Sequence, residues 1–85
     1  GAEINLGAWT VPPVFAFLKK KGNIADLEML RTFNMGMGFL LVVAQNEADK
    51  AFDAIGQTGE HAVLVGKVIE GENEVRYAGS VKYAE

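Results

Sequence analysis

The residues with the clearest chemical potential lie between positions 31 and 38, where the chain reads R-T-F-N-M-G-M-G. Gly36 and Gly38 open an apolar run, which indicates that either a ligand or another part of the protein approaches them closely. Glycine-rich phosphate loops lead into a helix N-terminus, whose N–H groups face the anion. These glycines instead follow a predicted helix C-terminus, the negative end of the dipole, so close packing is favoured over a phosphate site. We expect a neighbour against Gly38; Gly36, nearer the turn, can also require a positive φ.

Three polar residues share this segment with the glycines. Arg31 falls in the last turn of a predicted helix, where it can neutralise the terminal carbonyls or reach toward a substrate. Thr32 and Asn34 are small polar groups suited to turn and cap hydrogen bonds. The segment holds no complete catalytic set, so the residues by themselves predict no reaction.

Other residues capable of chemistry are isolated. His61 is the only histidine, and Glu60 beside it would point to the opposite face of a strand, which makes the two poor co-ligands. There is no cysteine, so a thiolate metal site and disulfides are excluded. The run Lys19 to Lys21 is interpreted as a solvated helix end rather than an anion site.

Composition predicts one small globular domain or a piece of a larger protein, since the chain has 85 residues of which 49% are hydrophobic. Its net charge of −3 argues against a nucleic acid or an anionic membrane as the main partner. The longest apolar run, 39–44, is far too short to span a bilayer. The lack of cysteine fits a reducing compartment, and we expect a cytoplasmic protein.

The elements that must position these residues follow from periodicity and caps. Helices are predicted within 10–22, 23–34 and 46–59, and strands at 35–44, 61–69 and 74–83. Pro13 suits the first turn of the first helix, and Gly22 its left-handed end. The expected caps are Asn23 with Asp26 for the second helix and Asn46 for the third, with Asn34 as a left-handed stop. Trp9 is expected to attach the first helix to the core.

The predicted fold is α+β, with the order α-α-β-α-β-β and a mixed sheet on which the helices pack. Both faces of 35–44 are apolar, so this strand should be interior. Its crossover connection should make it parallel to 61–69. The strands 61–69 and 74–83 should form a hairpin across 70–73, with the amphipathic 74–83 nearer an edge.

Three stretches carry a family resemblance: W-T-V-P-P-V-F-A-F-L at 9–18, E-M-L-R-T-F-N-M-G-M-G at 28–38, and G-E-H-A-V-L-V-G-K-V at 59–68. Together with G-N-I at 22–24, they closely resemble the C-terminal region of the aminoimidazole ribonucleotide synthetase family, also called phosphoribosylformylglycinamidine cyclo-ligases. The resemblance covers about residues 9–69. The long motif ending in the two glycines is its most specific part.

The resemblance implies a purine-biosynthesis ligase that uses ATP and Mg²⁺ to close the imidazole ring of aminoimidazole ribonucleotide. Family members have two domains, are usually dimers, and bind ATP mainly through an N-terminal domain. Residues 1–85 would then be a partial C-terminal domain that binds no cofactor and has no activity by itself. Its expected partners are the N-terminal domain of the same enzyme and a nucleotide substrate. No residue is assigned a catalytic role, and the implied wall of the substrate cleft comprises Arg31, Thr32, Asn34, Gly36 and Gly38.

A chain that begins with Gly1 rather than methionine fits a fragment. The alternative is a stand-alone, non-catalytic interaction module of the same fold. A partial domain should expose apolar surface, so we also expect self-association or an uncovered apolar sheet face.

Overall fold

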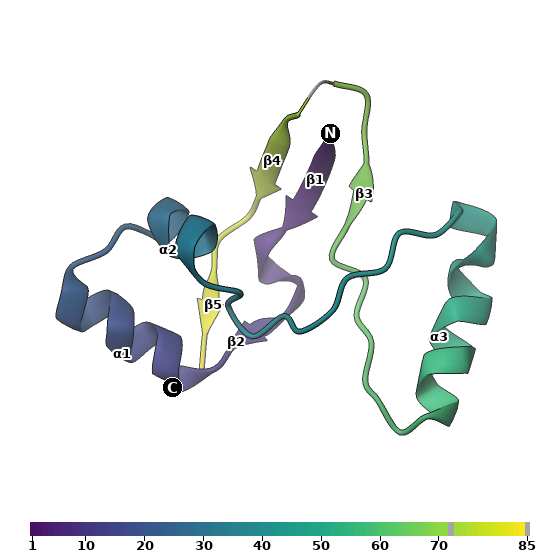
Figure 1. Cartoon of the computed structure of the whole chain (residues 1–85), viewed down its shortest axis with the longest axis horizontal. Coiled ribbons are helices and arrows are strands. Elements are labelled where there is room, and N and C mark those ends of the chain that lie inside the picture. The colour runs from purple at the N-terminus through teal and green to yellow at the C-terminus, as the bar shows by residue number, and fades with distance from the viewer. Residues whose placement is uncertain (72, 85) are drawn as a thin grey trace.

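The computed structural model describes residues 1–71 and 73–84 (Figure 1). It contains both helices and strands, as the predicted α+β class requires. In chain order the elements are β1 (Ala2–Asn5), the 3₁₀ turn η1 (Leu6–Ala8), β2 (Thr10–Val11), α1 (Pro13–Gly22), α2 (Asp26–Thr32), the 3₁₀ turn η2 (Gln45–Glu47), α3 (Ala48–Gln57), β3 (Gly66–Val68), β4 (Val75–Ala78) and β5 (Lys82–Tyr83).

The strands form two small sheets, one of which is mixed. The first has the order β3-β1-β4, with β1 antiparallel to β3 and parallel to β4. The second pairs β2 with β5 in parallel. A mixed sheet is present, as predicted, but it is formed by β1 with β3 and β4 rather than by 35–44 with 61–69 and 74–83. As expected, β4 lies at an edge.

The predicted strand order is wrong in two places. The strands at 61–69 and 74–83 do not pair as a hairpin, because β1 lies between β3 and β4. The second of these segments is also divided into β4 and β5, with Gly79 at φ +74° between them. Residue 72 of the predicted connection 70–73 lies outside the described residues. The short N-terminal strands β1 and β2 were not predicted, because strands of two to four residues carry almost no periodic signal.

The predicted interior strand at 35–44 is also absent. Residues 35 and 36 form a turn, and 37–44 has no regular structure. Large apolar side chains in this run face solvent; Phe39 is 83% and Val42 80% exposed. The apolar pattern favours a strand, but a strand also needs a neighbour for its backbone hydrogen bonds. None of the described segments pairs with 37–44.

The helix positions were predicted well and their caps were not. Pro13 begins α1 as expected, but the left-handed residue at its end is Asn23 (φ +52°) rather than Gly22. Asn23 therefore cannot cap α2, which begins after Ala25 with no cap from a described side chain. Similarly, Asn46 lies within η2, and among the described side chains none caps α3.

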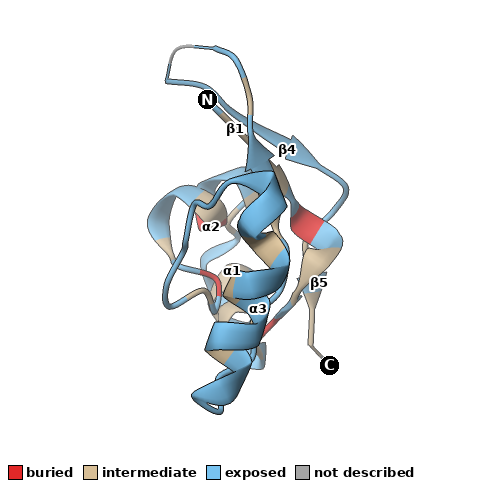
Figure 2. Cartoon of the chain, turned by 90° about the vertical axis from the view of Figure 1, so that its right-hand side faces the viewer, coloured by how far each residue is buried: buried red, intermediate tan, exposed pale blue. Residues whose placement is uncertain are grey.

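The core lies between α1, α2 and the β2–β5 pair. Val11, Met29 and Met35 are buried, and the side chains packed around them are Trp9, Phe15, Leu18, Ile24, Leu30, Phe33, Val81 and Tyr83. By contrast, α3 lies at the far side of the molecule from α1 (Figure 1). No residue of α3 is buried (Figure 2), and on its predicted apolar stripe Phe52 is exposed. Among the helices of 1–71 and 73–84, none is long and apolar enough to cross a membrane.

Candidate functional site

A tight turn at residues 34–37 organises the predicted cleft wall. The N–H of Met37 donates to the carbonyl of Asn34 at 3.0 Å, which closes a four-residue turn. Both central residues have positive φ, +55° at Met35 and +91° at Gly36, as in a type I′ turn. Asn34 Oδ1 also accepts a hydrogen bond from the N–H of Gly36 at 2.9 Å. The predicted role of Asn34 as a left-handed stop is therefore wrong, because its two neighbours take the left-handed conformation while its side chain stabilises the turn.

The two glycines of the motif have opposite surroundings. A Cβ added to Gly36 would lie 2.5 Å from Cδ of Pro12, so a neighbour does pack closely there. The positive φ of Gly36 disfavours any larger residue independently. At Gly38 no described atom lies within 4 Å of the equivalent position. The expectation of a neighbour against Gly38 is therefore wrong in this chain.

Trp9 holds the same turn through a hydrogen bond. Its Nε1–H donates to the carbonyl of Met35 at 3.0 Å, and the Met35 side chain is only 1% exposed. The left-handed backbone costs a residue with a side chain roughly 1 to 2 kcal/mol. Burial of Met35 and the Trp9 hydrogen bond offset that strain. Trp9 packs on the core as predicted, and it also fixes the turn.

A mainly apolar hollow of about 400 Å³ lies beside the turn. The residues that line it are Ile4, Trp9, Leu30, Phe33, Asn34, Met35, Met37, Gly38, Phe39, Leu40 and Val65. Two residues of the predicted wall, Asn34 and Gly38, are among them. Gly36 lies in the adjoining turn and does not line the hollow.

Arg31 and Thr32 do not line this hollow. Arg31 Nη1 lies 3.5 Å from Glu28 Oε2, and both side chains are largely exposed. Such a pair contributes little to stability. Thr32 is the exposed last residue of α2. Of the five predicted residues, the structure therefore brings three together around the turn.

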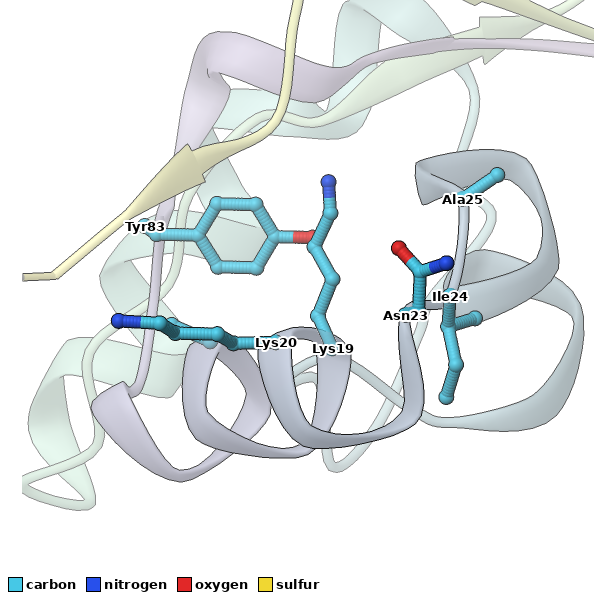
Figure 3. Close-up of a pocket in the computed structure, with 7 residues that line it drawn as sticks. Lys19, Lys20, Asn23, Ile24, Ala25 and Tyr83 are labelled. Carbon is cyan, nitrogen blue, oxygen red and sulfur yellow. The ribbon is translucent and has the colours of Figure 1, made fainter.

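A second, open hollow of about 630 Å³ lies at the C-terminal end of α1 (Figure 3). Lys19 Nζ lies 2.9 Å from Asp26 Oδ1, and the Tyr83 hydroxyl donates to the same oxygen at 2.6 Å. Lys19 Nζ also lies 5.7 Å from the centre of the Tyr83 ring. The prediction of a solvated helix end is therefore correct for Lys20 and Lys21, which are exposed. It is wrong for Lys19, which is half-buried in a cluster with Asp26 and Tyr83.

The cluster shifts two pKa values in opposite directions. The hydrogen bonds from Tyr83 and then Lys19 stabilise the Asp26 carboxylate and lower its pKa from 3.8. Burial, together with the hydrogen bond to Asp26, raises the pKa of the Tyr83 hydroxyl to about 12. Both shifts favour the same state, with Asp26 charged and Tyr83 protonated.

Metal ligands are not grouped in the described part of the chain. His61 is exposed, and no three histidine or acidic side chains of 1–71 and 73–84 are placed to share an ion.

Comparison with known proteins decides the family. Residues 1–78 match the family described as "AIR synthase related protein, C-terminal domain". The chain belongs to this family. The match is wider than the 9–69 of the sequence resemblance, and it includes the β1 and β4 strands that the motifs did not cover.

Two curated relatives of this chain carry the same name. The chain is 41% identical over 81 residues to a phosphoribosylformylglycinamidine cyclo-ligase of Bacillus pumilus, with 95% of this chain and 23% of the relative covered. It is 39% identical over 74 residues to that of Thermoanaerobacter sp. strain X514, covering 87% of this chain and 22% of the relative. The chain thus spans 22–23% of the length of these two relatives.

Sequence reasoning missed two interactions in this domain. Trp9 was given only a packing role, although its indole N–H reaches a turn 26 positions away. The Asp26–Tyr83 bond joins residues 57 positions apart. The sequence shows that Asp26 lies in the first turn of a helix and that Tyr83 lies on the apolar face of a strand. No spacing rule predicts that these two residues pair.

Proposed function

We propose that this chain is the C-terminal part of a phosphoribosylformylglycinamidine cyclo-ligase and is inactive by itself. The observation that carries the proposal is that relatives of this name are 39–41% identical to it over 87–95% of its length. The match of residues 1–78 to the family of AIR synthase related C-terminal domains supports the same assignment.

The proposed reaction closes a ring. ATP, bound with Mg²⁺, activates the formyl oxygen of formylglycinamidine ribonucleotide, and an amidine nitrogen then attacks the activated carbon. The products are aminoimidazole ribonucleotide, ADP and phosphate. We assign ATP and Mg²⁺ to the N-terminal part of the same cytoplasmic, dimeric enzyme, because the resemblance covers only the C-terminal region.

In this proposal the present chain contributes one wall of the substrate cleft. Asn34 and Gly38 line the hollow beside the turn, and Gly36 allows that turn to form against Pro12. Arg31 and Thr32 extend the wall along the exposed end of α2. The apolar run around Phe39 and Val42 is where the remainder of the enzyme covers this chain, since exposed apolar patches generally mark contacts.

A chimera tests the proposal directly. The matched C-terminal region of the Bacillus pumilus cyclo-ligase is replaced by residues 1–85, and formation of aminoimidazole ribonucleotide and ADP is measured. We expect ATP-dependent turnover within about tenfold of that relative. A folded chimera that forms no product would refute the proposal. The isolated chain is the control: calorimetry should detect no binding of ATP with Mg²⁺.

The competing function is a stand-alone interaction module. The exposed run at 39–43 is the observation that favours it, because such a surface can bind another protein. The length of the natural reading frame separates the two. A frame of about 85 codons with its own start codon would support the module, whereas a frame several times longer would support the ligase.

A further inference from the structure

The backbone at Met35 and Gly36 is unusual enough to require an explanation. A type I′ turn normally has glycine, asparagine or aspartate at its first central position, whereas this turn has methionine there, at φ +55°. Backbone of this kind persists when the surroundings hold it, and it is concentrated at ligand sites. The residues that hold the turn are therefore candidates for a role beyond stability.

Residues that flank β2 hold the turn. Trp9, just before β2, donates its indole N–H to the carbonyl of Met35 at 3.0 Å. Pro12, just after β2, lies against Gly36. Since β2 pairs with β5, these two residues directly adjoin a hydrogen-bonded strand. A side chain held on a regular element can position a site more accurately than one on a loop.

The turn at 34–37 also orients the side chain of Asn34. The Trp9 hydrogen bond sets the plane of the peptide between Met35 and Gly36, and the N–H of this peptide donates to Asn34 Oδ1 at 2.9 Å. With its oxygen engaged in this way, the Asn34 amide has its NH₂ group to donate. Asn34 lines the hollow of about 400 Å³, and so do Trp9 and Gly38.

We propose that Trp9 is a positioning residue of the substrate cleft, which acts through the Met35–Gly36 peptide to aim the Asn34 amide N–H at an acceptor atom of the bound ribonucleotide. This inference rests on the proposed ligase function. It assigns Trp9 to the site, and it specifies that the group facing Asn34 is a hydrogen-bond acceptor, such as a carbonyl or phosphate oxygen.

The first experiment measures the turn in the 85-residue chain without any ligand. Trp9→Phe removes the indole N–H and keeps an aromatic ring. We expect the Met37 amide, which closes the turn, to exchange its hydrogen about fivefold faster, as the loss of one hydrogen bond of about 1 kcal/mol implies. The Asn5 amide, bonded to Val65 in the other sheet, should change less than twofold. Tyr77→Phe, which removes a polar atom on β4, is the matched control and should change neither. An unaltered Met37 rate in Trp9→Phe would overturn the proposal.

The second experiment uses the chimera and asks whether Trp9 acts through Asn34. We expect Trp9→Phe to raise KM for the ribonucleotide about tenfold, with kcat changed less than threefold, at a temperature where the variant is fully folded. The double variant Trp9→Phe/Asn34→Ala should lose no more than Asn34→Ala alone, because the two residues form one unit. If the losses of kcat/KM in the two single variants instead multiply in the double variant, the residues act independently, as a purely structural role of Trp9 predicts, and the proposal is overturned.

The two experiments separate this inference from the function on which it rests. An inactive parent chimera refutes the ligase function, and the exchange rates still decide whether Trp9 fixes the turn. An active parent whose KM is unaffected by Trp9→Phe leaves the ligase function intact and refutes the positioning role.

Discussion

Gly36 and Gly38 are two residues apart and have opposite surroundings. Gly36 has a positive φ and lies against Pro12, in a turn held by Trp9. Gly38 begins a run whose side chains are mostly exposed and whose backbone pairs with no described strand. The comparison shows that two glycines of one motif can have different structural roles. Gly36 allows close packing in a turn, whereas Gly38 borders open space beside a hollow.

The largest expected effect separates the two glycines by stability. Gly36→Ala should lower the free energy of unfolding by roughly 2 to 4 kcal/mol, because it adds left-handed strain and a clash with Pro12. Gly38→Ala is the matched control and should be neutral or stabilising by up to about 1 kcal/mol, since alanine restricts the unfolded chain. Urea unfolding of both variants measures the difference. Equal losses in the two variants would show that the contrast between the glycines is not real.

A smaller effect on stability is expected for the cluster of Lys19, Asp26 and Tyr83. Tyr83→Phe removes the hydroxyl that donates to Asp26 and should lower the free energy of unfolding by about 1 kcal/mol at neutral pH. Thermal melts at pH 7 measure this loss. Asp26→Asn in the same assay indicates how much of the effect depends on the carboxylate charge, and no change in either variant would contradict a stabilising cluster.

The pH dependence of stability follows from the same pair. The folded pKa of Tyr83 is raised from 10.0 to about 12, so the unfolded chain loses this proton first and the stability contributed by Tyr83 falls between pH 10 and 12. The folded pKa of Asp26 is lowered from 3.8, so its contribution is present above pH 3.8 and is lost as the pH falls through the folded value. The measurement is the free energy of unfolding of the parent and of Tyr83→Phe across both pH ranges. The fall in stability between pH 10 and 12 should be absent from Tyr83→Phe. An alkaline step that remains in this variant would have to come from another group.

The smallest effect on stability is expected in the open run. Phe39→Ser should change the free energy of unfolding by less than about 0.5 kcal/mol, because the side chain is 83% exposed. Its effect should be on association instead. Sedimentation at high concentration should show self-association of the parent that Phe39→Ser weakens. A parent that remains monomeric throughout would count against the exposed run as a contact surface.

Sequence reasoning was most accurate where the structure depends on local preferences. The start of α1 at Pro13 could be predicted because proline has its preferred backbone angle and an unneeded N–H at this position. The family could be recognised from the motif around Gly36. The caps were predicted less well, because Asn23 can either begin one helix or end another, and the connection between α1 and α2 decides which.

The candidate site could be located in part. Asn34 and Gly38 line the hollow as members of the predicted wall, whereas Trp9 could not be assigned to it from a position 25 residues before Asn34. An indole N–H and a backbone carbonyl carry no sequence signal of their pairing.

The sequence by itself determined the α+β class, the three helices, the absence of disulfides and the membership of the AIR synthase C-terminal family. Only the tertiary structure decided that β1 lies between β3 and β4, that Trp9 holds the turn at Met35, and that 37–44 forms no strand. The physical reason is the range of the interactions. Helices close their hydrogen bonds within a few residues, whereas a strand needs a partner that can lie anywhere in the chain, so an apolar, strand-like pattern without such a partner remains irregular and exposed.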